Sequence, residues 1–179
     1  MLQVTFYYEG EHSIFELLSE LKFKYDNGTY VLNASTYTAV IVHDAANKKL
    51  LLTFSKELSF DQYKSLHKVI KTIAENISAS VDDHLALMGY LGDGSEAFIF
   101  NGWSHWMIFL EDAKHVSMEG QKVQVFNNDV LLGEGILMAF QKDKTVKEDF
   151  RIIECLLITK NGERTLLGDH LKIIATGEF

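Results

Sequence analysis

Hydrophobic and polar residues alternate at residues 2–8, which predicts an opening β-strand with one buried face. Further stretches of strand character follow at residues 23–25, 29–33, 37–43 and 50–54. Asn27-Gly28 separates two of these stretches, and an Asn-Gly pair between apolar runs is a strong short-range signal for a hairpin. The pattern therefore predicts an antiparallel meander.

Two segments instead have apolar residues three or four positions apart, which predicts helices with one apolar face. Ser59 and Gln62 form a capping box in front of the longer helix, and Ser13 and Glu16 form the same motif in front of a short helix that ends near Leu21. The apolar stripe of the longer helix consists of Phe60, Tyr63, Leu66, Ile70, Ile73 and Ile77. We expect this stripe to pack on the sheet.

The segment that follows carries signals for a further helix and a further hairpin. Asp82 is a favoured type of N-cap residue and predicts a short helix up to Leu91, before a Gly-Asp-Gly turn. Residues 96–100 and 103–110 flank Asn101-Gly102 and are predicted to pair across it. Because apolar residues fall on both faces of these two stretches, we expect the pair to be covered on both sides.

The last sixty residues contain five short stretches of strand character, at 122–126, 131–140, 151–159, 164–167 and 171–174. Gly133 and Gly135 are expected to bend the second strand through a bulge, since the third glycine of a dinucleotide-binding loop is missing. A single helical turn is expected at 168–170. This order resembles an SH3-like small barrel over about a third of the chain, and such barrels serve unrelated functions.

These elements predict an α+β protein with an N-terminal antiparallel sheet, one long helix and one or two short ones, followed by a five-stranded SH3-like small barrel. The chain contains no proline, so the boundary is inferred from glycine, asparagine and charge. The segment Ser117–Gln121 is the best candidate, which predicts an acidic unit over 1–118 and a barrel unit over 119–179. One compact domain is the alternative.

Composition narrows the classes of function. The formal net charge is −8, which opposes binding to a phosphate backbone, so no nucleic-acid role is expected. Residues 1–120 hold 16 acidic and 9 basic residues, whereas residues 121–179 hold 9 and 8. A protein partner is expected, and a basic one would dock on the acidic N-terminal unit.

Neither a membrane span nor a secretory signal is visible in the sequence, so a cytoplasmic location without membrane contact is expected. The single cysteine, Cys155, fits a reducing compartment. It lies in an apolar strand without a nearby histidine, which predicts an inert buried thiol. No cofactor is expected.

Asp82, Asp83 and His84 bring two carboxylates and an imidazole together. Oxygen and nitrogen donors of this kind suit a divalent metal ion or acid-base chemistry. The alternative interpretation, a helix N-cap with an acid in the first turn, is favoured because aspartate is common there. No second ligand pair with metal-site spacing occurs elsewhere in the sequence.

Trp103, His105 and Trp106 follow the Asn101-Gly102 turn. Tryptophan is enriched in the energetically important centres of interfaces, so these residues are the candidate binding residues. Burial in the core is the competing interpretation, because both predicted flanking strands are apolar. Trp103, next to the turn, is the best single anchor.

The sequence contains no recognisable catalytic motif, and we expect a non-enzymatic protein-binding module, such as an inhibitor, an immunity-type protein or an adaptor. One alternative is a ligand-binding protein or a metal-dependent hydrolase with its cleft between the two units, using Asp82, Asp83 and His84. A second alternative is a subunit of a phage or other multi-protein assembly that joins through exposed hairpin edges.

Overall fold

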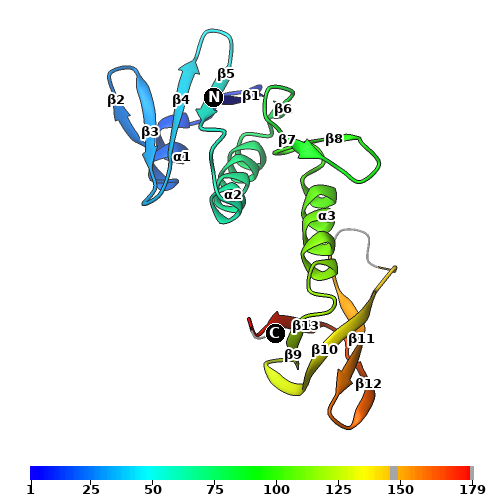
Figure 1. Ribbon diagram of the computed structural model, residues 1–179. Helices are drawn as coiled ribbons and strands as arrows, with labels where there is room; N and C mark the ends of the chain where they lie inside the picture. Colours follow the sequence, from blue (N-terminus) through cyan, green and yellow to red (C-terminus); the bar gives the residue numbers. More distant parts are fainter. Residues whose placement is uncertain (146–148, 178–179) are drawn as a thin grey trace. The chain divides into compact units, whose positions relative to one another are not determined.

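The computed structural model describes residues 1–145 and 149–177, and contacts divide the chain into two compact units, Met1–Trp103 and Ser104–Phe179 (Figure 1). The division falls at the first residue of helix α3 (Trp103–Val116), whereas the expected boundary near residue 118 lies after this helix. Both units combine helix with antiparallel sheet, so the α+β class is confirmed. The predicted units 1–118 and 119–179, and the alternative of one compact domain, stay predictions.

A six-stranded antiparallel sheet forms the centre of the first unit, with the strand order β2-β3-β4-β5-β1-β6. The elements of this unit are β1 (Leu2–Tyr7), α1 (Ile14–Glu20), β2 (Lys24–Asp26), β3 (Thr29–Asn33), β4 (Thr38–Asp44), β5 (Lys49–Phe54), α2 (Phe60–Asn76), β6 (Ser80–Asp82), β7 (Leu87–Tyr90) and β8 (Glu96–Phe98). Asn27 and Gly28 both have positive φ angles, +46° and +86°, as a type I′ hairpin turn requires. The predicted meander is confirmed.

Helices α1 and α2 contribute their buried side chains to the same core as the sheet. The capping box of α2 is present, because the Ser59 hydroxyl accepts from the Gln62 amide and the Gln62 side chain accepts from the Ser59 amide. The capping box expected at Ser13 is wrong, since its side chain makes no cap hydrogen bond. Ser13 has a ψ angle of 79°, whereas Ser59 has the extended value of 164°.

Residues 82–91 contain strands rather than a helix, so the expected helix from Asp82 to Leu91 is wrong. Asp82 ends β6, which pairs with β1 at the edge of the sheet, and β7 pairs with β8. The Leu91 amide donates to the Ser95 carbonyl at 2.9 Å and closes the Gly-rich turn between them. Strand pairing gives the main-chain N–H and C=O groups of this segment hydrogen-bond partners. A short helix without tertiary packing would be only marginally stable.

The stretch 103–110 is the first part of α3, so the expected hairpin arm is wrong. The Asn101-Gly102 turn exists, with Gly102 at a φ of +87°, but it leads into a helix. Periodicity alone cannot distinguish a covered strand from a helix in a short apolar run. Lys114 lies in the last helical turn, where positive charge complements the helix dipole.

The second unit contains α3 and five antiparallel strands in the order β12-β11-β10-β9-β13. The strands are β9 (Lys122–Asn127), β10 (Val130–Lys142), β11 (Ile152–Thr159), β12 (Gly162–Leu167) and β13 (Leu171–Ala175). The first four strands pair in succession and the fifth pairs with the first, which is the connectivity of an SH3-like small barrel. This part of the fold prediction is confirmed. The helical turn expected at 168–170 is wrong, since these residues form a bend.

The two glycines of β10 occupy the bend of the barrel, as predicted. The pairing of β9 with β10 shifts its register between Leu131 and Gly133, which marks a bulge. At Gly135 the strand comes so close to β11 that a Cβ atom would lie 2.5 Å from the carbonyl oxygen of Ile158. Glycine is therefore required at residue 135 by close packing of two backbones.

The two units have separate cores. The first consists mainly of aliphatic and aromatic side chains of the six-stranded sheet, α1 and α2. The second consists of Val123, Val125, Leu137, Ile152, Cys155, Leu157, Leu166, Leu171 and Ile173. In the part of the chain that the structure describes, no helix is long and apolar enough to cross a membrane.

Candidate functional site

The solvent-facing side of the barrel strands β10, β11 and β12 carries large apolar side chains. Ile136 lies opposite Ile158, and Ala139 lies opposite Leu156, in the register of β10 and β11. These positions alternate with the core residues Leu137, Cys155 and Leu157, so they point away from the core. We define the outer barrel patch as Ile136, Met138, Ala139, Leu156, Ile158 and Leu167.

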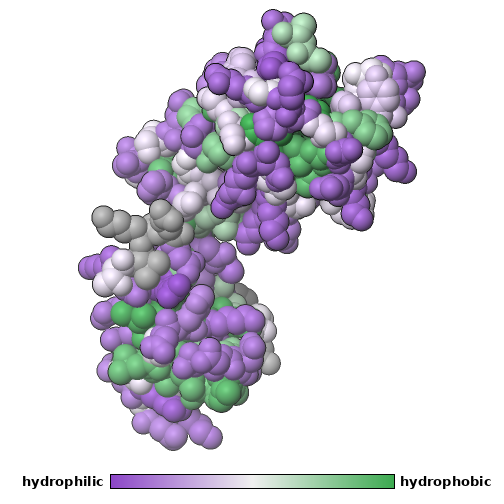
Figure 2. Space-filling view, turned by 180° about the vertical axis from the view of Figure 1, so that it is seen from behind, coloured by the Kyte–Doolittle hydropathy of each residue, from purple (hydrophilic) through white to green (hydrophobic). Residues whose placement is uncertain are grey.

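Three members of the outer barrel patch are strongly exposed, with Leu167 at 68%, Met138 at 46% and Ile158 at 41%. The outer face of an antiparallel sheet is normally polar. Figure 2 shows hydrophobic side chains at the surface of the second unit among hydrophilic ones. A contiguous exposed apolar surface with a polar border is typical of a binding site.

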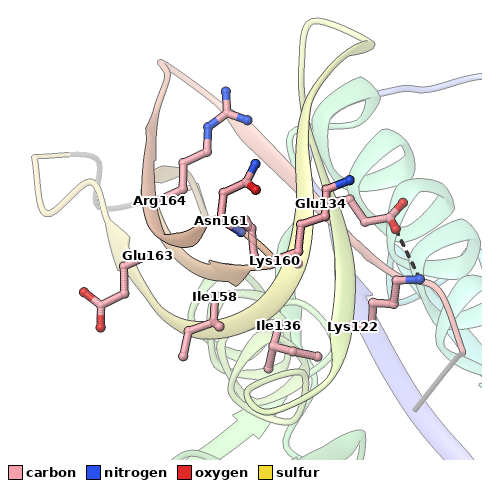
Figure 3. A pocket seen from close by; sticks show the side chains of 10 residues that line it. Lys122, Glu134, Ile136, Ile158, Lys160, Asn161, Glu163 and Arg164 are labelled. Carbon is pink, nitrogen blue, oxygen red and sulfur yellow. Dashed lines mark hydrogen bonds and ion pairs between the residues drawn. The ribbon is translucent and has the colours of Figure 1, made fainter.

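A solvent-open groove with a volume of about 760 Å³ adjoins the patch. Its apolar part is formed by Ile136 and Ile158, which lie side by side in Figure 3. The polar part comes from β9 and β10 on one side and from the β11–β12 turn with the start of β12 on the other. These polar residues include Lys122, Glu134, Lys160, Asn161, Glu163 and Arg164.

Of the carboxylates around the patch, one has an ion-pair partner and two have none among the described residues. Glu134 forms an ion pair with Lys122 at 3.2 Å and accepts a hydrogen bond from Gln124 at 2.9 Å, which together lower the pKa of its carboxyl group. Glu154 and Glu163 also border the patch, and neither forms an ion pair with any described residue. The β11–β12 side of the patch thus presents two carboxylates without a cation.

The predicted metal ligands are divided between two different roles. The carboxylate of Asp83 is buried and accepts hydrogen bonds from the Phe100 amide at 2.7 Å, the Asn101 amide at 2.9 Å and the Asn101 side chain at 2.6 Å. The carboxylate of Asp82 accepts a hydrogen bond from Nδ1 of His84, which lowers the pKa of Asp82. Asp83 therefore holds the loop before α3 in place.

Among residues 1–145 and 149–177, no group of three or more His, Cys, Asp or Glu side chains is placed to hold a metal ion. Asp82 and His84 are both exposed, with 40% and 67% of their side chains accessible. They form a local pair within one loop. This geometry does not direct the Asp83 carboxylate toward His84, because its oxygens are bonded to the loop at residues 100–101.

The predicted binding residues lie on the first turn of α3. Trp103 is half-buried and stacks on His67, Trp106 is buried with 8% exposure, and His105 is exposed. The helix thus separates the three side chains into different environments. Their role in binding stays a prediction.

The outer barrel patch was missed in the sequence reasoning, although a signal was present. Leu156, Leu157 and Ile158 are three consecutive apolar residues in a strand, and such a run places apolar side chains on both faces. In a small barrel only one face is covered by the barrel's own core. The run therefore indicated that both faces of β11 would be apolar.

Comparisons with known proteins complete the description of the site. No protein-family model matches the chain, and no curated protein matches it significantly. One solved structure is similar, the biotin protein ligase from Aquifex aeolicus in complex with biotin and ATP, with 14% sequence identity. The match covers 90% of this chain and 67% of that one with a TM-score of 0.24. A similarity at this level supports no conclusion about function.

Proposed function

We propose that this protein is a non-enzymatic protein-binding module, of the inhibitor, immunity or adaptor kind, that binds its partner through the outer barrel patch. The proposal rests on the exposure of Met138, Ile158 and Leu167 on the solvent-facing side of the barrel sheet. Polar side chains are usual on such a face. Protein interfaces combine an apolar centre with a polar border. The patch, with Glu154 and Glu163 beside it, has this composition.

The distribution of charge allows this location as well as the N-terminal unit. With the division at Trp103, the first unit has 13 acidic and 8 basic residues and the second has 12 and 9. The difference between the units is smaller than with the division near residue 118. Both units are acidic, so a basic partner is favoured for either surface, and the exposed apolar centre selects the second.

A capture experiment with two matched variants tests the proposal. Ile158→Lys places a charge in the patch, and Ile174→Lys places the same charge on β13, at a residue with the same exposure of 41%. Each variant and the wild type are used as bait in lysate of the native host, and bound proteins are identified by mass spectrometry. Circular dichroism shows whether each bait is folded.

We expect a stoichiometric protein partner with the wild type and Ile174→Lys, and loss of that partner with Ile158→Lys. Equal capture by the two lysine variants would contradict the proposal, because the patch would then not be the contact. Capture of no partner by any folded bait would contradict it as well.

A further inference from the structure

Strand β12 lies at one end of the barrel sheet, and in the described part of the chain no strand pairs with its outer edge. An end strand offers main-chain N–H and C=O groups to another strand. Proteins usually block such edges with charged side chains, most often lysine, with a proline or with a bulge. β12 has no lysine, proline or bulge and pairs with β11 in unbroken register from Gly162 to Leu167, and its charged residues are Glu163 and Arg164.

The side chains of β12 define what a neighbouring strand would meet. Glu163, Thr165 and Leu167 alternate with Arg164 and the buried Leu166, so they share the outer face with the patch. Glu163 has no ion-pair partner among the described residues, and Leu167 is 68% exposed. The edge thus presents a carboxylate and a leucine four residues apart, separated by about 13 Å along the strand.

We propose that the partner adds an extended segment to the edge of β12 as a sixth strand, with an apolar residue beside Leu167 and a lysine or arginine beside Glu163. This inference rests on the proposed function and specifies the chemistry of the partner. Directly opposed residues on one face of an antiparallel pair interact. The segment therefore carries an apolar and a basic residue four positions apart, and its main chain supplies the remaining bonds.

Charge argues against pairing of this edge with the β12 of a second copy of this chain. The only cation of β12 is Arg164, whose side chain points to the opposite face from Glu163. In a symmetric antiparallel pair, opposed residues point to the same face. The Arg164 of a second β12 could not lie opposite Glu163, and the carboxylates would stay unneutralised.

A synthetic strand serves as the probe. The acetylated and amidated peptide Thr-Val-Thr-Val-Thr-Lys-Thr places valine beside Leu167 and lysine beside Glu163 on one face. Binding is followed by amide chemical shifts of the ¹⁵N-labelled full-length chain. A second peptide has glutamate in place of lysine. Two further peptides carry N-methyl groups on alternate residues, one set for each edge of the peptide.

We expect the lysine peptide to shift the amide signals of β12 and of the adjacent β11. The glutamate peptide should bind more weakly, because it loses a cross-strand pair worth up to about fivefold in affinity and places two carboxylates opposite each other. One N-methylated peptide should lose binding and the other should keep it, because only one edge of an added strand faces β12. Tolerance of both N-methylated peptides, or an absence of shifts in β12 at millimolar peptide, would overturn strand addition.

The protein variants separate charge pairing from other effects. Glu163→Lys should reverse the preference, so that the glutamate peptide binds more tightly than the lysine peptide. Glu163→Gln, which removes the charge alone, should abolish the difference between the peptides. Glu119→Lys, an exposed residue outside the strands, is the control and should keep the wild-type preference. An unchanged preference in Glu163→Lys would overturn the assignment of Glu163.

The two proposals fail in different experiments. Partner capture that depends on Ile158, together with failure of the peptide experiment, would overturn strand addition and leave the proposed function in place. Capture that does not depend on Ile158 would overturn the proposed function, while the peptide experiment would still decide whether the edge of β12 accepts a strand.

Discussion

His67 stacks on Trp103 with 4.3 Å between the ring centroids and an angle of 7° between the ring planes. Nδ1 of His67 donates a hydrogen bond to the carbonyl oxygen of Ile99 at 2.7 Å. Burial lowers the pKa of His67 from its model-compound value of 6.5, outweighing the opposing effect of this hydrogen bond. The imidazole of His67 therefore packs on the indole of Trp103 in its neutral form.

The first prediction concerns the pH dependence of stability. Because the pKa of His67 is lower in the folded chain than in the unfolded chain, the unfolded chain binds the proton more readily. The free energy of unfolding should therefore decrease as the pH falls below about 6.5 and should stop responding to this group below its folded pKa. Urea denaturation of the wild type and of His67→Gln between pH 7.5 and pH 5 checks this, and His67→Gln should lose part of the decrease.

The stack also offers a direct optical measurement of the same pKa. In a Trp106→Phe variant, Trp103 is the only tryptophan, and its fluorescence should be quenched as His67 becomes protonated. The midpoint of quenching should lie below pH 6.5. A midpoint above that value, or quenching that persists in the double variant with His67→Gln, would show that another group titrates beside the indole.

The second prediction concerns Asp83. Its carboxylate accepts three hydrogen bonds from residues 100 and 101, and removal of a charged acceptor leaves buried donors without partners. Asp83→Ala should lower the free energy of unfolding by about 3 kcal/mol. Asp82→Ala, next to it but exposed, is the control and should change stability much less. Equal effects of the two substitutions in urea denaturation would contradict the structural role of Asp83.

The third prediction concerns the reactivity of Cys155. Burial in the barrel core, with the nearby charge of Glu154 as a smaller cause, raises the pKa of its thiol to about 12. The thiolate is the reactive form, so the thiol should not react with a disulfide reagent at pH 8 while the chain is folded. One equivalent should react in denaturant. Rapid reaction of the folded chain would show that the barrel opens readily.

The fourth prediction concerns the bend of β10. An added Cβ at Gly135 would lie 2.5 Å from the Ile158 carbonyl oxygen, and this atom belongs to a backbone that cannot turn aside. At Gly133 the nearest atoms are side-chain atoms of Arg164 and Leu166 at 3.3 Å, which can adjust. Gly135→Ala should lower the melting temperature clearly more than Gly133→Ala. A larger decrease in melting temperature for Gly133→Ala than for Gly135→Ala would contradict the close contact between residue 135 and the Ile158 carbonyl oxygen.

The elements that could be predicted from sequence are those whose signals lie close together in the chain. The hairpins at Asn27-Gly28 and Asn161-Gly162 join β2 to β3 and β11 to β12 as such pairs usually do. The third pair, Asn101-Gly102, failed as a hairpin signal. Its turn is stabilised by Asp83, seventeen and eighteen residues earlier in the chain, and no local pattern reveals such a contact.

The predicted site residues show the same limit. Trp103 and Trp106 follow the same turn in the predicted hairpin, but the helix places one against His67 and buries the other. The outer barrel patch draws on three strands, and its exposure depends on what covers each face of the sheet. Periodicity can indicate that Leu156 and Ile158 share a face, but it cannot show that this face is left open.

The sequence by itself determined the strands of the meander, the long capped helix and the five strands of the barrel, because periodicity, capping and turn chemistry act between residues a few positions apart. Tertiary structure alone decided that 103–110 is helical, that 82–91 pairs as strands, and that an apolar surface remains on the barrel. Those outcomes depend on distant partners such as Asp83 and β1, and on which sheet faces the folded chain covers.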